Sequence, residues 1–106
     1  MDQKTIDTIK AFLRAIAEMK LVLISAFVFG SFARGNQKAD SDIDLALVVE
    51  NMNDNEKFDL QVKLILLASK FDARIEPHPF SKNDFMTLNP FVEEVKRTGI
   101  EISWWS

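Results

Sequence analysis

Residues 27–49, FVFGSFARGNQKADSDIDLALVV, carry the strongest fold signal in this 106-residue chain. Two apolar runs are joined there by a polar segment that Gly30 and Gly35 bracket. The first run, residues 21–29, is apolar almost throughout and ends at Gly30, so we expect a buried strand. The second run, residues 43–49, is predicted to be another strand.

Gly30 and Ser31 lie at the turn after the first predicted strand. Glycine lets a backbone approach a ligand closely and adopt positive φ. A strand that ends in Gly-Ser and turns into a short helix presents free backbone N–H groups, which can hold a phosphate together with the Ser31 hydroxyl. Such turns are common, so this signal is weak by itself.

Asp42 and Asp44 flank Ile43 where the second predicted strand begins. Because side chains alternate along a strand, the two carboxylates share one face and Ile43 points into the core. Neighbouring carboxylates repel each other unless a cation neutralises them, and hard oxygen ligands favour Mg²⁺ or Mn²⁺. For an isolated Asp-x-Asp pair, two solvated carboxylates at an exposed strand start are the more common explanation.

Apolar residues at helical spacing predict helices over residues 5–20 and 56–71. The second helix has a wide apolar face, which we expect to be buried; contact with another protein is the alternative. A short strand is predicted over residues 73–76, because Pro77 and Pro79 would stop it.

Capping signals predict two short helices near the end of the chain, followed by an edge strand over residues 100–105. The first helix opens at the capping box of residues 81–84, and the second opens at Asn89-Pro90 and ends at Thr98-Gly99. The predicted order α-β-β-α-β-α indicates an α+β (mixed α/β) fold. We expect a small mixed β-sheet with helices packed on it, in one domain over residues 1–106.

Composition excludes several classes of protein. The net charge of −3 argues against general nucleic-acid binding, which needs a clustered cationic surface. The absence of Cys excludes disulfides and thiolate metal sites. The longest apolar run is roughly half the ~20 residues that span a bilayer, and no signal peptide is evident. We therefore expect a cytoplasmic protein without membrane association.

Together, the Gly-Ser turn and the Asp-x-Asp pair resemble the nucleotidyltransferase superfamily that includes DNA polymerase β, most closely its minimal, single-domain (MNT) members. The shared pattern is an apolar strand, Gly-Ser, a short loop and Asp-x-Asp entering the next strand, present here as GSFARG and SDIDL. The resemblance is tight over this motif and loose over the rest of the chain. It implies the nucleotidyltransferase fold, with residues 1–106 as one minimal domain.

The resemblance also implies roles for the motif residues. Gly30 and Ser31 would hold the β- and γ-phosphates of a nucleoside triphosphate, and Asp42 and Asp44 would ligate two Mg²⁺ ions, with Mn²⁺ as the alternative. Arg34, one turn past Ser31, is a candidate phosphate ligand through its planar guanidinium. A surface salt bridge is the other interpretation of Arg34.

Members of the superfamily carry a third carboxylate on a later strand, usually Asp, and Glu76 is its best match here. Asp72 is the rival, but it precedes the predicted strand. Glu in place of Asp departs from the common pattern and puts the rate of catalysis in doubt more than nucleotide binding. We expect His78, between two prolines, to be a partly exposed loop residue; it shares the face of Glu76 only if the extended backbone continues.

The implied activity is Mg²⁺-dependent transfer of a nucleoside monophosphate, AMP from ATP, to a hydroxyl group. Asp42, Asp44 and Glu76 would be both the metal ligands and the catalytic residues. Minimal members are typically encoded beside small helical HEPN proteins, so analogy makes the acceptor a HEPN-type toxin in a hetero-oligomer and this chain its antitoxin. The alternative is a non-catalytic nucleotide-binding or toxin-masking module, which Glu76 and the wide apolar helix favour.

Overall fold

The fold is built on a mixed β-sheet, seen in a computed structural model that describes residues 1–35, 37–38, 41–87 and 89–105. The strand order is β3-β2-β1-β4. β2 lies antiparallel to β1 and parallel to β3, while β4 lies antiparallel to β1. The strands are β1 (Leu23–Phe29), β2 (Ile43–Val49), β3 (Ile75–Ser81) and β4 (Ile100–Glu101).

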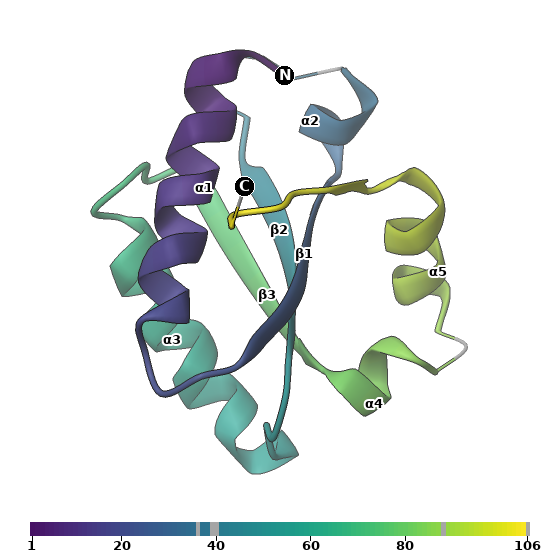
Figure 1. Ribbon diagram of the computed structural model, residues 1–106. Helices are drawn as coiled ribbons and strands as arrows, with labels where there is room; N and C mark the ends of the chain where they lie inside the picture. Colours follow the sequence, from purple (N-terminus) through teal and green to yellow (C-terminus); the bar gives the residue numbers. More distant parts are fainter. Residues whose placement is uncertain (36, 39–40, 88, 106) are drawn as a thin grey trace.

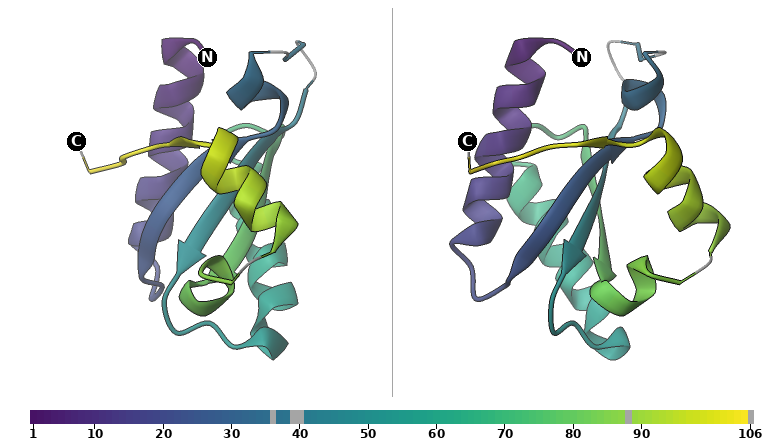
Figure 2. Two further views of the ribbon diagram at one scale, coloured as in Figure 1. Left: turned by 90° about the vertical axis from the view of Figure 1, so that its right-hand side faces the viewer. Right: turned by 45° about the vertical axis from the view of Figure 1, so that its right-hand side comes forward.

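Helices cover both faces of this sheet, with α1 and α3 on one side and α4 and α5 on the other (Figures 1 and 2). The short α2 lies at the end of the sheet where β1 finishes (Figure 1). The predicted α+β class, with helices packed on a small mixed sheet, is therefore confirmed. The helices are α1 (Gln3–Ala17), α2 (Ser31–Arg34), the 3₁₀ turn η1 (Asp54–Glu56), α3 (Lys57–Ala68), α4 (Lys82–Phe85) and α5 (Pro90–Thr98).

Each face of the sheet has its own apolar cluster, because side chains alternate along the strands. Under α1 and α3, the cluster includes the fully buried Leu45 and Leu47 of β2. Under α4 and α5, it includes Ala46 and Val48 of the same strand, packed with Val92 and Val95. β2 is thus buried on both sides. Within β2 only Asp44, near the end beside α2, keeps a partly exposed side chain.

Caps set the helix boundaries largely as predicted. α1 begins at Gln3, earlier than expected, because the Asp2 carboxylate accepts a hydrogen bond from the Thr5 backbone N–H at 2.8 Å. Ser81 caps α4 and Asn89 caps α5, which confirms both predicted short helices. None of the helices in the described part of the chain is both long and apolar enough to cross a bilayer.

The predicted end of the third strand at Glu76 is wrong, because β3 continues through Pro77 and Pro79. β3 is an edge strand, and its prolines lie where they remove no ladder hydrogen bond. The carbonyl oxygen of Arg74 accepts from the Ile43 N–H at 2.8 Å, so even-numbered residues direct their backbone groups toward β2. The odd-numbered prolines therefore direct their nitrogens toward the open edge.

The expectation of a well-buried second long helix is also wrong. Only Leu64 and Ala68 of α3 are buried, since one side of the helix packs on the sheet and no described segment covers the other. Large apolar side chains stay exposed on α3: Phe58 (74%), Leu66 (63%), Ile65 (43%) and Val62 (40%). This exposed apolar side is consistent with the alternative given above, contact with another protein.

The last predicted strand is shorter than expected. β4 contains only Ile100 and Glu101, after which the chain crosses toward α1 (Figure 1). The Trp104 carbonyl accepts a hydrogen bond from Arg14 Nε at 2.9 Å. The indole of Trp104 is buried against the core, while that of Trp105 is exposed. The C-terminal segment therefore ties the sheet to the first helix.

Candidate active site

Gly30 joins the two halves of the sequence motif. It follows Phe29, which lies opposite Asp44 in the antiparallel pair of β1 and β2. Its φ of 74° and ψ of −149° belong to a region that residues with a side chain rarely adopt. A Cβ at this position would lie 2.7 Å from Asp44 Oδ2. Glycine is required here both by the backbone conformation and by the close approach of the Asp44 carboxylate.

Ser31 begins α2, the single helical turn next to that carboxylate. Phe32 anchors the turn in the core, and Gly35 ends it with a left-handed φ of 74°. Arg34 is exposed at the end of the turn, and its backbone N–H donates to the Gly30 carbonyl at 3.2 Å. The turn thus brings Gly30 and Ser31 beside Asp44 and leaves the Arg34 side chain in solvent.

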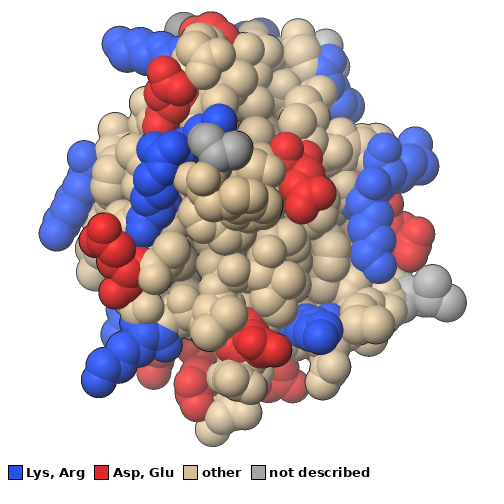
Figure 3. All heavy atoms as spheres, in the orientation of Figure 1, with Lys and Arg blue, Asp and Glu red and all other residues tan. Residues whose placement is uncertain are grey.

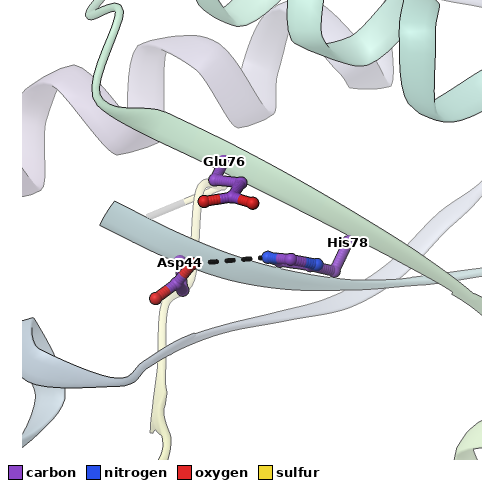
Figure 4. A group of neighbouring side chains, drawn as sticks. All are labelled: Asp44, Glu76 and His78. Carbon is purple, nitrogen blue, oxygen red and sulfur yellow. Dashed lines mark hydrogen bonds and ion pairs between the residues drawn. The ribbon is translucent and has the colours of Figure 1, made fainter. Parts of the chain in front are cut away.

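Asp44, Glu76 and His78 converge from two parallel strands (Figure 4). Asp44 lies opposite Glu76 in the register of β2 and β3, and His78 follows on the same face. His78 Nε2 lies 3.3 Å from Asp44 Oδ1. One ligand atom from each of the three residues lies within 4.8 Å of the other two. The expectation that His78 is a loop residue is therefore wrong.

Like charges crowd Glu76. Partial burial is the largest cause that raises the pKa of Glu76 above its ordinary value, and His78 opposes it. The charges of Asp44 and Asp42, and a side-chain hydrogen bond with Asp42, raise this pKa further. Asp42 is exposed just before β2 begins, close enough to exert this effect. The predicted carboxylates Asp42, Asp44 and Glu76 therefore influence one another electrostatically, although they come from separate parts of the chain.

The donor chemistry fits a divalent cation. Two carboxylates and an imidazole are metal ligands, and a cation among them would relieve the repulsion between Asp44 and Glu76. Carboxylate oxygens suit Mg²⁺ and Mn²⁺, whereas the imidazole of His78 adds a ligand that transition metals accept more readily. His78 was not among the predicted ligands, because the strand was expected to stop at Pro77; side-chain alternation continued past Pro77 would have placed it on the face of Glu76.

Asp72, the rival third carboxylate, has a different partner. It forms an ion pair with Arg74, whose Nη2 lies 2.7 Å from Asp72 Oδ2. Hydrogen bonds from Arg74 hold the pKa of the Asp72 carboxyl below its ordinary value. The Arg74 guanidinium also lies over the Phe32 ring, 5.6 Å from its centroid. The Asp72–Arg74 pair supports the loop before β3 and leaves Glu76 as the carboxylate beside Asp44.

Surface charge is mixed on the face that Figure 3 shows. Lys and Arg side chains are spread over it, with Asp and Glu side chains among them, and no single basic patch forms in this view. The distribution agrees with a net charge of −3.

Comparison with protein families and curated proteins gives matches over nearly the whole chain. The family model described as "Polymerase beta, Nucleotidyltransferase" matches residues 11–102. A protein of Methanocaldococcus jannaschii named "Putative protein adenylyltransferase" is 31% identical over 102 residues, which covers 92% of this chain and 97% of the relative.

Solved structures share the fold at lower identity. A Sulfolobus solfataricus protein described as a "putative nucleotidyltransferase" superimposes with a TM-score of 0.61 at 20% identity, over 91% of this chain and 77% of its own. A toxin–antitoxin structure with AMP-PNP gives a TM-score of 0.58 at 23% identity, over 92% and 72%. A mutant of the toxin–antitoxin pair MntA–HpeT gives 0.59 at 21%, also over 92% and 72%.

Proposed function

Because the chain belongs to the polymerase β nucleotidyltransferase family and is therefore a nucleotidyltransferase, we propose that it transfers AMP from ATP to a hydroxyl group of a partner protein. The observation that carries the proposal is the close approach of Gly30 to the Asp44 carboxylate. This approach supports the proposal because it sets the Gly30-Ser31 turn, whose backbone can hold a phosphate, directly beside side chains that could hold a metal ion.

Each residue of the site has a role in this reaction. The backbone of Gly30 and Ser31 binds the β- and γ-phosphates, and the exposed Arg34 guanidinium pairs with a phosphate oxygen. Asp42, Asp44 and Glu76 would hold two Mg²⁺ ions, with Mn²⁺ as the alternative. When bound, these cations supply charge stabilisation for the departing pyrophosphate and for the attacking oxygen.

Transfer then requires an oriented acceptor. The acceptor oxygen forms a bond to the α-phosphorus while the bond from that phosphorus to the pyrophosphate oxygen breaks, and the hydroxyl proton leaves. Glu76 lies on β3, on the far side of Asp44 from β1. Glu76 is exposed, so its carboxylate is open to an acceptor that approaches from that side. Glu76 is therefore the proposed base.

The named relatives support a protein as the acceptor. The relative at 31% identity bears the name of a protein adenylyltransferase, and two of the similar structures are toxin–antitoxin pairs. On this basis the partner is a HEPN-type toxin, and this chain acts in the cytoplasm as its antitoxin within a hetero-oligomer. The identification of the partner rests on analogy with these relatives, whereas the proposed transfer reaction rests on the chemistry of the site.

Label transfer from α-³²P-ATP to a co-expressed toxin tests the proposal. The double variant Asp42→Asn with Asp44→Asn is expected to lose labelling, because both carboxylates are neutralised. A matched control, Asp7→Asn with Glu18→Gln, removes two exposed carboxylates at α1, away from the exposed side of α3, and is expected to label normally. Undiminished labelling by the Asp42/Asp44 double variant would contradict the assigned site.

A toxin-masking module is the second candidate, and the exposed apolar side of α3 favours it. Phe58 is 74% exposed and Leu66 is 63% exposed, as expected for a surface that a partner covers. The same double variant separates the two functions. If it still neutralises the toxin fully in cells, masking is sufficient and the catalytic proposal fails; if neutralisation is lost while the complex still forms, transfer is required.

A further inference from the structure

We propose that the Phe91 ring is the platform on which the nucleobase of the bound triphosphate stacks. The inference rests on the proposed function, since it assumes that a nucleoside triphosphate occupies the site. Phe91 lies in the first turn of α5, far along the chain from the Gly-Ser and Asp-x-Asp motifs. It is a large aromatic side chain beside the carboxylates, and 42% of it remains exposed.

Aromatic contacts place Phe91 next to the site. Its ring meets Phe29 edge to face, with centroids 5.2 Å apart, and Phe29 lies opposite Asp44 in the sheet. The His78 ring lies 6.3 Å from that of Phe91 and carries the Nε2 atom that reaches Asp44. Phe91 is therefore separated from the carboxylate cluster by only one side chain.

Buried aromatic side chains fix the position of the Phe91 ring. Phe29 and Phe80, 8% and 9% exposed, pack against it, the latter with centroids 5.6 Å apart. The Phe91 backbone N–H donates to the capping Asn89 Oδ1 at 2.8 Å, and Pro90 opens the helix. A ring fixed by buried neighbours, with part of its surface left in solvent, can stack on a ligand with little loss of conformational entropy.

The order of groups along the sheet favours the nucleobase as the occupant. β1 ends at the phosphate-binding turn, and β2 and β3 run away from that end. Along β3, Glu76 comes first and His78 follows, one step further from α2. A triphosphate held at Gly30 with its α-phosphorus beside Asp44 therefore extends its nucleoside toward His78 and Phe91. An aromatic face stacks on any base.

Calorimetry with two ligands tests this placement. We would measure the Kd of ATP and of inorganic tripolyphosphate, both with Mg²⁺, for the wild type and for Phe91→Leu, Phe91→Ala and Phe91→Tyr. Leu and Ala are expected to weaken ATP binding by about tenfold, the magnitude of one lost stacking contact, and to leave tripolyphosphate binding unchanged. Tyr keeps the ring and is expected to bind ATP like the wild type.

Controls separate stacking from folding. Leu keeps apolar contact with Phe29, so thermal unfolding should show Phe91→Leu still folded. The matched control, Phe58→Leu, changes an exposed Phe on α3, on the opposite layer, and is expected to bind ATP like the wild type.

Three outcomes would overturn the inference. Equal losses for ATP and tripolyphosphate would mean that Phe91 only shapes the phosphate site. Unchanged ATP binding with reduced labelling of the acceptor would mean that the ring contacts the acceptor. A wild type that binds neither ligand would count against the proposed function itself, a result distinct from the other two.

Discussion

Gly30 has a backbone conformation that is accessible almost only to glycine, and a Cβ at this position would lie against the Asp44 carboxylate. Ala at this position combines backbone strain with a Cβ 2.7 Å from Asp44 Oδ2. We expect Gly30→Ala to lower the free energy of unfolding by about 2–3 kcal/mol, measured with urea. ATP binding should fall as well, because the Asp44 carboxylate must move.

Gly35 provides the control, because it has the same φ of 74° but nothing within 4 Å of the position of an added Cβ. Gly35→Ala is expected to cost about 1–2 kcal/mol through backbone strain alone. It should leave ATP binding unchanged. If both variants bound ATP equally well, the contact between Gly30 and Asp44 would have no part in the site.

Asp72 should make stability depend on pH through its pairing with Arg74. The pKa of Asp72 is lowered in the folded state by hydrogen bonds from Arg74, so folding is favoured when the carboxylate is charged. This contribution is complete above the unfolded pKa of about 3.9 and disappears as pH falls through the lower folded pKa. Asp72→Asn is therefore expected to destabilise at pH 7 by about 1 kcal/mol, and less as pH falls toward 3.

Urea unfolding of the wild type and the variant at pH 7 and pH 3 checks this expectation. The exposed pair of Arg97 with Glu94 on α5 serves as the comparison, with side chains that are 73% and 45% exposed. Glu94→Gln should change stability by no more than about 0.5 kcal/mol at pH 7. A difference between wild type and Asp72→Asn that grew on acidification would contradict the assigned pair.

α3 has one buried side and one exposed side, and substitutions at the neighbouring residues Leu64 and Ile65 test the packing of each side. Leu64 is fully buried, so Leu64→Ala is expected to cost about 2–5 kcal/mol in the free energy of unfolding. Ile65 is 43% exposed, so Ile65→Ala should cost under about 1 kcal/mol. If the exposed side binds the partner, Ile65→Glu should weaken co-purification of the toxin and leave ATP binding intact. An Ile65→Ala variant as unstable as Leu64→Ala would contradict this packing.

Ligand binding should stabilise the whole domain. ATP with Mg²⁺ at a hundred times its Kd is expected to add about 2.7 kcal/mol to the free energy of unfolding. For a domain of this size, that corresponds to a rise of about 10 °C in Tm. A chelator should cancel the rise, and the variant with Asn at positions 42 and 44 should show none. A full rise in excess chelator would contradict metal-assisted binding.

Local patterns predicted most of the elements. Apolar periodicity located α1, β1, β2 and α3, and the caps at Ser81 and Asn89 located α4 and α5. The predicted end of β3 at Glu76 was wrong because a proline disrupts a strand only where its nitrogen faces a neighbouring strand. Which side of β3 is open depends on the order of strands in the sheet. The prediction that α3 is well buried was wrong for a related reason. A wide apolar face in the sequence shows that a helix can be buried, but only the tertiary packing shows whether another segment lies on it.

The family and the two motifs of the candidate site could be predicted from local sequence. The Gly-Ser turn and the Asp-x-Asp pair are local, because turn conformation and strand alternation depend only on neighbouring residues. Glu76 was also predicted, from the family resemblance, but only the folded chain shows that His78 joins Asp44 and that Phe91 lies next to them. The parallel register of β2 with β3 sets Glu76 and His78 beside Asp44, and packing of α5 on β1 adds the ring of Phe91. Such contacts follow from sheet order and helix packing, which join segments that are remote in the chain.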